Sequence, residues 1–189
     1  SDNIADLERS TFRSMRMSAV FSHILDIDDG MDALEKYVGE IENCSEFYLC
    51  LYSDWDTLSD PVLTLAASED PDGFSSDVPS NTVLLKLGMK NGRRLPECSF
   101  QKNSLLPEFL ENSSDASYII SPLFFEDRAF GYIAMAFEKN RLNYNFKLVP
   151  FIMNITQLLS DLCDSKRTRL LTEHLETLYL RDVLTGLYN

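Results

Sequence analysis

The longest hydrophobic pattern in the chain lies near its C-terminus and predicts a helix over residues 144–181. Its apolar residues recur at alternating spacings of four and three, which places them on one face of a helix. They are Leu148, Ile152, Ile155, Leu159 and Leu162. At about 1.5 Å per residue such a helix would reach on the order of 55 Å, whereas a domain of this size is only about 30–35 Å across. We therefore expect the helix to protrude and to pair with a second copy of itself in a parallel homodimer.

Polar and basic residues interrupt this apolar stripe over residues 164–169. The stripe restarts in a shifted register at Leu171, Leu175 and Leu178. If the first register continued past Leu162, Lys166 and Arg169 would lie in the dimer seam, where like charges repel. A helix pair that adopts either register at little cost can act as a switch, so this break is a candidate for the point where a signal passes along the helix. A solvated charged turn without a coupling role explains the same residues equally well.

Two further helices are predicted at the N-terminus. Residues 4–25 contain neither Pro nor Gly and favour helix. Their apolar stripe is weak, so a partner helix such as the C-terminal one would have to complete it. The sequence Asp26-Ile27-Asp28-Asp29-Gly30 interrupts this helix, and an aspartate there can cap the next one. From Met31 to Ile41, apolar residues again recur at helical spacing.

Strand patterns fill the middle of the chain. The clearest strand is 46–52, aromatic-rich and apolar on both faces, with further candidates at 61–67 and 83–89. Residues 117–125 and 129–137 are two β-rich runs that predict a hairpin.

The segments between these strands predict turns and close contacts. Lys90-Asn91-Gly92 would turn the chain after the strand at 83–89. Gly131 would allow a backbone or a helix to approach closely. Residues 96–112 are expected to be irregular, with one helical turn at 106–110. The order predicts one antiparallel sheet of about five to six strands with helices on one face, an α+β fold with long N- and C-terminal helices.

Charge narrows the range of partners. With 30 acidic and 17 basic residues the net charge is −13, which repels nucleic acid and anionic membranes, so neither is expected to bind. No stretch approaches the ~20 apolar residues of a membrane span.

The pattern of reactive residues argues against catalysis. The four cysteines, Cys44, Cys50, Cys98 and Cys163, lie far apart without Cys-x-x-Cys spacing or neighbouring histidines. Neither a metal site nor another cofactor is therefore expected, and a reducing cytoplasm is the expected location. The sequence contains no Gly-rich phosphate loop and no nucleophile elbow, so we expect no enzymatic activity from this segment.

One motif lies at the end of the long helix. Residues 182–189 read Asp-Val-Leu-Thr-Gly-Leu-Tyr-Asn and resemble the opening of the GGDEF family of diguanylate cyclases, Asp-x-Leu-Thr-Gly-Leu-x-Asn. The fixed positions are met by Asp182, Leu184, Thr185, Gly186, Leu187 and Asn189. The resemblance implies a cyclase domain after the helix, of which only the first residues are present. A simple helix C-terminus with Gly186 in the left-handed conformation is the other interpretation.

A second resemblance lies in the predicted hairpin. Pro122-Leu123, the turn Glu126-Asp127-Arg128 and Gly131-Tyr132-Ile133 resemble the signature of GAF sensor domains. PAS domains are similar in outline, but a second helix leading into a cyclase favours GAF. The likeness spans about residues 28–160 and is carried by pattern. The bilin-binding cysteine of photoreceptor GAF domains is not matched, since Ser99 and Phe100 follow Cys98.

These resemblances imply a domain plan and a function. A linker helix (1–27) would precede a GAF-like sensor domain (28–143), a signalling helix (144–181) and the GGDEF opening (182–189). The segment would then relay a ligand or an upstream signal to control cyclic di-GMP synthesis. A ligand-free dimerisation spacer and a free-standing small-molecule-binding domain remain as alternatives.

An unknown small molecule could bind beside the first strand. Tyr48, Cys50 and Tyr52 share one face of that strand, and tyrosines with polar tips suit a ligand cavity. Trp55 and Phe100, on flanking loops, could close it. The same rings could equally fill a core beneath the loops.

Overall fold

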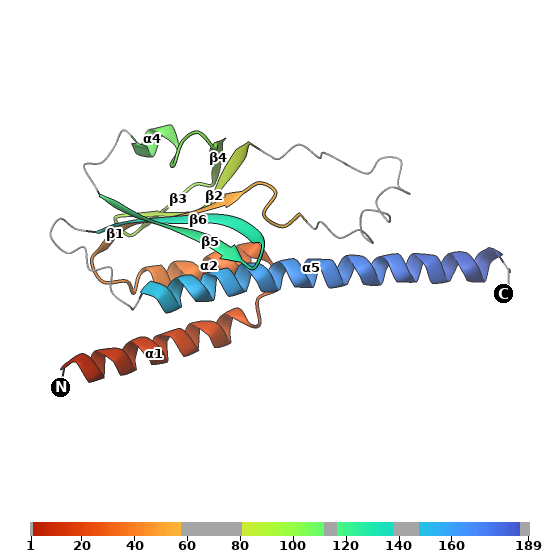
Figure 1. Cartoon of the computed structure of the whole chain (residues 1–189), viewed down its shortest axis with the longest axis horizontal. Helices are drawn as coiled ribbons and strands as arrows, with labels where there is room; N and C mark the ends of the chain where they lie inside the picture. The colour runs from red at the N-terminus through yellow and green to blue at the C-terminus, as the bar shows by residue number, and fades with distance from the viewer. Residues whose placement is uncertain (1, 58–80, 112–116, 138–147, 186–189) are drawn as a thin grey trace.

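The computed structural model describes residues 2–57, 81–111, 117–137 and 148–185. Within them, six strands form one open antiparallel sheet in the order β3-β2-β1-β6-β5, with β4 also paired to β2 (Figure 1). The strands are β1 (Cys44–Tyr52), β2 (Thr82–Lys90), β3 (Arg93–Leu95), β4 (Cys98–Gln101), β5 (Tyr118–Phe125) and β6 (Arg128–Phe137). The predicted α+β class and strand number are confirmed.

Three helices lie on one side of the sheet, α1 (Asp2–Phe21), α2 (Ile27–Val38) and α5 (Leu148–Thr185) (Figure 1). The short helix α4 (Glu108–Glu111) lies on the other side of the sheet. Asp26 caps α2, as its position predicts, because its side chain accepts a hydrogen bond from the Asp29 amide at 2.9 Å. None of the described helices is both long and apolar enough to span a membrane.

Side chains of β1 alternate between two hydrophobic clusters. Phe47, Leu49 and Leu51 face the helices, whereas Tyr48 and Cys50 face the opposite side of the sheet. All five are buried, because β1 lies in the middle of the sheet and both of its faces are covered. The sequence predicted this division.

The first half of α5 covers the helix-facing side of the sheet. Leu148, Ile155, Leu159 and Leu162 are buried in that core, and Ile152 packs against it. Phe151 lies edge-on to Phe47 with ring centroids 6.0 Å apart. The expectation that this stripe lacks a partner within its own chain is therefore wrong. Periodicity identifies an apolar helix face but does not distinguish a sheet of the same chain from a second helix.

Helix α1 is more than a linker, because its second half joins the core. Met17 and Phe21 are buried, and the Asn154 side-chain amide of α5 donates to the Ser14 carbonyl oxygen and hydroxyl at 3.2 and 3.0 Å. Helix α5 thus packs against α1, as expected, but of the apolar residues of the predicted stripe only Phe21 is buried, while Ile4, Leu7 and Leu25 are exposed.

The turn after β2 and the hairpin of β5 and β6 form as predicted, whereas residues 98–101 differ from the prediction. Asn91 and Gly92 have φ of 50° and 73° and turn β2 into β3. The hairpin of β5 and β6 is present. Residues 98–101, expected to be irregular, form β4, which pairs with β2. Cys98 and Phe100 alternate with Ser99 and Gln101, but a run of this length is too short to identify a strand by itself. The strand predicted at 61–67 lies outside the described residues.

Gly131 lies where two backbones nearly touch. With φ at 149°, an added Cβ would lie 2.0 Å from the Cys50 carbonyl oxygen and 2.8 Å from the Leu51 Cα. The predicted close approach is confirmed, and its partner is β1.

Candidate functional site

Four of the five predicted ligand-site residues gather on the sheet face opposite the long helices. Tyr48 and Cys50 are buried there, and Tyr52 and Phe100 pack against them, partly buried. Phe100 reaches this face because β4 pairs with β2, where Phe100 lies opposite Val83.

Trp55 lies on the other side of the sheet. The chain turns directly after β1, with the Trp55 amide donating to the Tyr52 carbonyl oxygen at 3.0 Å. This turn carries the indole into the helix-side core, where it is 9% exposed and lies edge-on to Phe130 at 6.4 Å. The expectation that Trp55 closes the same site as Phe100 is wrong.

The middle of this face is filled by its own chain. Leu106 and Leu110 pack into the cluster that contains Tyr48 and Cys50. The Tyr132 hydroxyl donates to the Leu105 carbonyl oxygen at 2.7 Å, which fastens this segment to the sheet. A ligand therefore cannot reach Tyr48 or Cys50 without moving the segment around Leu106.

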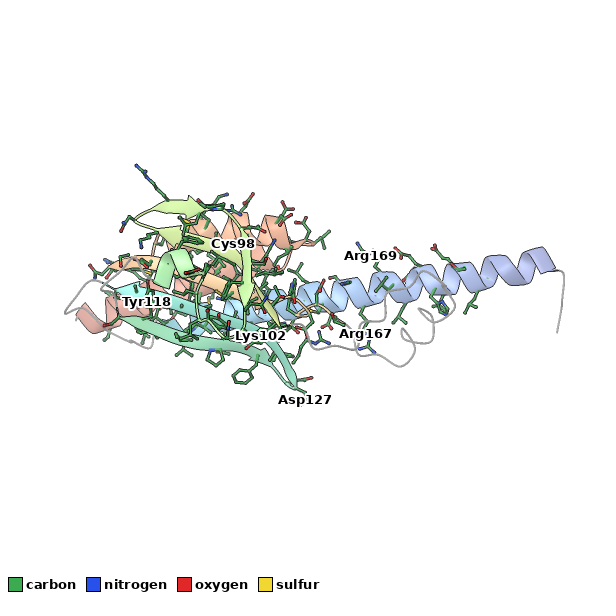
Figure 2. All side chains as sticks on the ribbon, turned by 90° about the horizontal axis from the view of Figure 1, so that it is seen from above. Cys98, Lys102, Tyr118, Asp127, Arg167 and Arg169 are labelled. Atoms are coloured by element: carbon green, nitrogen blue, oxygen red, sulfur yellow. The ribbon has the colours of Figure 1, made fainter. Side chains whose placement is uncertain are left out.

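Tyr52 and Phe100, at the far end of the same face, remain partly exposed. The Lys102 ammonium lies 4.5 Å from the centre of the Tyr52 ring, and Tyr132 meets the same ring edge-on at 6.5 Å. Figure 2 shows Lys102 just past β4. Two aromatic rings and a cation could bind a planar or anionic group here.

Sequence reasoning missed a buried carboxylate at the opposite end of β1. Glu46 is 6% exposed. One of its oxygens accepts hydrogen bonds from the hydroxyls of Tyr48, at 2.7 Å, and Tyr118, and the other lies 3.2 Å from the Lys90 ammonium. Ala136 lies between Glu46 and Tyr118 in the sheet and leaves room for them to meet. A charged residue in an otherwise apolar strand was the available signal.

These partners decide the protonation of the cluster. Burial alone would raise the pKa of Glu46, but the hydrogen bonds from Tyr118, Tyr48 and Lys90 outweigh it, and the net shift is downward. Burial, and then the bond to Glu46, raises the pKa of Tyr48 far above its ordinary value. The carboxylate stays charged and the phenol neutral, so the cluster is a satisfied structural network.

The cysteines are not poised for reaction. Burial raises the pKa of Cys44 to about 11 and that of Cys50 to about 12, so both remain thiols at neutral pH. Burial also raises the pKa of Cys98 and of Cys163, although Arg128 partly offsets it for Cys163. Among the described residues no cluster of His, Cys, Asp or Glu could hold a metal ion.

The second half of α5 leaves the sheet (Figure 1). Lys166 is not a free charge, because its ammonium lies 2.7 Å from an Asp56 carboxylate oxygen. The expectation that Lys166 repels its counterpart in a seam is contradicted by this ion pair. Arg169 lies within 3.9 Å of Glu173 on the exposed helix, and Figure 2 shows it beyond the sheet. Leu171 is half-buried, whereas Leu175 and Leu178 are exposed.

Helix α5 runs past its predicted end at residue 181 into the GGDEF-like motif. Asp182, Leu184 and Thr185 are its last residues, while Gly186, Leu187 and Asn189 lie outside the described residues. The structure thus brings together a largely filled sheet face and a helix that leads from the core to the motif. No protein-family model matches the chain, and no curated protein or solved structure is significantly similar to it.

Proposed function

We propose that this chain is the GAF-like regulatory and dimerisation segment of a diguanylate cyclase, which passes a signal along α5 to control cyclic di-GMP synthesis. The observation that carries the proposal is the continuity of α5. One uninterrupted helix runs from Leu148 in the core to Thr185 in the GGDEF-like motif. Because a helix resists bending, a displacement at its buried end would reach the motif.

A second copy of the chain is the proposed partner, through surfaces other than the stripe that the core already uses. On α1, Phe12 and Met15 are exposed together with Ile4 and Leu7. Among the described side chains on the second half of α5, Leu175, Leu178 and Tyr179 are exposed. Pairing two copies of α5 past Lys166 would cover the latter group.

The reachable end of the open sheet face is the proposed place for a ligand. Tyr52 and Phe100 are partly exposed, with Lys102 beside them. The burial of Tyr48 and Cys50 beneath Leu106 and Leu110 favours the second candidate function, a dimerisation spacer with a filled face. Native mass spectrometry of protein purified from its own host separates the two, because a co-purifying mass that is lost in Tyr52→Ala indicates a ligand. Protein that carries no added mass indicates the spacer.

The coding sequence after Asn189 tests the assignment directly. We expect Arg-Arg to follow and a Gly-Gly-Asp/Glu-Glu-Phe sequence to appear further on. If neither is present, the cyclase proposal is wrong, whatever the oligomeric state.

Sedimentation tests the dimer. We expect a dimer at tens of micromolar, and a monomer with unchanged circular dichroism for Leu175→Glu with Leu178→Glu, because charge in an apolar seam is costly. Thr172→Glu with Thr177→Glu adds the same charge at exposed positions beside the leucines and is the control. A wild-type monomer, or equal effects of both pairs, would exclude this interface.

A further inference from the structure

The loop that follows β1 is held in a defined shape. The Ser53 amide donates to the Thr82 carbonyl oxygen at 3.1 Å, which extends the pairing of β1 with β2 by one residue. Two turns follow, with the Trp55 amide donating to Tyr52 at 3.0 Å and the Thr57 amide to Asp54 at 3.0 Å. The end of β1 and residues 53–57 should therefore move as one unit.

This loop lies against α5 at two successive turns of the helix. The Cys163 thiol donates to the Trp55 carbonyl oxygen at 3.7 Å, a long, weak contact between buried groups. The Lys166 ammonium then donates to the Asp56 carboxylate at 2.7 Å and lies 3.4 Å from the Asp56 carbonyl oxygen. Trp55 is anchored in turn by Phe130 of β6. The loop thus connects three elements, β1, β6 and α5.

Among the described side chains of α5, the last buried ones lie just before Lys166. Before it, Leu159, Leu162 and Cys163 are buried in the core. After it, the hydroxyls of Thr168 and Thr172 donate to carbonyl oxygens four residues earlier in the same helix, at 2.9 Å in both cases. Leu171 and His174, further along, are still half-buried, so the Asp56–Lys166 pair lies where full burial of α5 gives way to partial burial.

We propose that residues 53–57 form a clamp on α5, and that the Asp56–Lys166 ion pair ties the helix to the domain one turn past Leu162 and Cys163. With the clamp closed, the sheet holds the helix through Lys166. With the clamp open, this contact is lost, and the nearest buried contacts are those of Leu162 and Cys163, one turn earlier. The same unit carries Tyr52 on the opposite sheet face, so a group that displaces Tyr52 pulls on the clamp.

The role of the clamp in signalling rests on the proposed function. The contact that holds residues 53–57 against α5 does not. Hydrogen exchange on the 189-residue chain measures only how far this contact protects α5, whether or not a cyclase domain follows. Failure of the clamp would leave the cyclase proposal standing, and failure of the cyclase proposal would leave the clamp standing.

The test compares amide exchange in residues 164–170 between the wild-type chain and Asp56→Asn. The two side chains of the ion pair are 35% and 36% exposed, so we expect exchange about two- to fivefold faster, as for a partly exposed ion pair. Exchange in β1 and β6 should stay unchanged. Glu173→Gln is the control, because it breaks the Arg169–Glu173 pair, which joins no other element.

A swap variant addresses the pair itself. Asp56→Lys with Lys166→Asp restores opposite charges, and we expect it to recover most of the lost protection, whereas Lys166→Gln alone should match Asp56→Asn. Unchanged exchange in Asp56→Asn would overturn the clamp. So would an equal effect of Glu173→Gln, or no recovery in the swap variant. If Asp56→Asn instead unfolds the chain, Lys166→Gln and the swap variant still decide between these outcomes.

Discussion

Replacement of Leu159 by alanine tests whether the first half of α5 belongs to the core of one chain. Leu159 is 0% exposed in the helix-side core. A Leu→Ala change at such a site costs about 2–5 kcal/mol, because it removes buried methyl groups and leaves a cavity. We expect a loss of about 3 kcal/mol, a large part of the ~5–15 kcal/mol that holds a typical domain folded. For a chain of this length the melting temperature should fall by roughly 6–12 °C.

Urea denaturation, followed by circular dichroism at a fixed protein concentration, gives the free energy of unfolding. Leu175→Ala is the matched control on the same helix, since Leu175 is 64% exposed. In a monomer it should cost less than about 0.5 kcal/mol. If Leu159→Ala were as mild as Leu175→Ala at concentrations where the chain is monomeric, the packing of α5 described above would be wrong. Glutamate at Leu159 and Leu162 should unfold the chain, not merely dissociate a dimer.

Three further outcomes are expected. The folded-state pKa of Glu46 is lowered from its ordinary 4.5, so its charge stabilises the fold above that pH and loses this effect as the pH falls through the lowered pKa. The destabilisation by Glu46→Gln, read from urea denaturation, should thus shrink between pH 7 and pH 3, and a constant difference would contradict the network. Gly131→Ala should cost more than about 3 kcal/mol because its Cβ overlaps the β1 backbone, whereas Gly92→Ala, at φ 73° with open space around it, should cost about 1 kcal/mol; equal melting temperatures would contradict this. The purified chain should make no cyclic di-GMP from GTP by chromatographic assay, since the motif at its end contains no catalytic residue of the family; turnover that survives purification would contradict the assignment.

The sequence predicted what depends on local periodicity. The two faces of β1, the cap at Asp26 and the turn at Asn91 and Gly92 each follow from a few neighbouring residues. Strands β3 and β4 were not predicted, because they have only three and four residues and depend on backbone pairing to β2. Helix α5 was predicted with the wrong partner for its first half, since the surface that covers an apolar stripe is a tertiary property.

The errors in the candidate site have the same origin. Trp55 is three residues from Tyr52, but one turn carries it to the other side of the sheet. Glu46 and Tyr118 are 72 residues apart in the sequence, and only the pairing of β1, β6 and β5 brings them together. Asp56 and Lys166 meet across 110 residues. The charge of Glu46 in an apolar strand was a local signal, but the partners of these side chains carry none.

Because α5 is long past Lys166, any tilt of the helix at that residue would move its far end by a large distance. From Arg167 to Thr185 the helix extends for roughly 28 Å, at about 1.5 Å per residue. A tilt of about 10° at Lys166 would move its far end by roughly 5 Å, which is one helical turn. Under the proposed clamp, a small change of angle at the domain would therefore become, at the far end of α5, a displacement of about one helical turn.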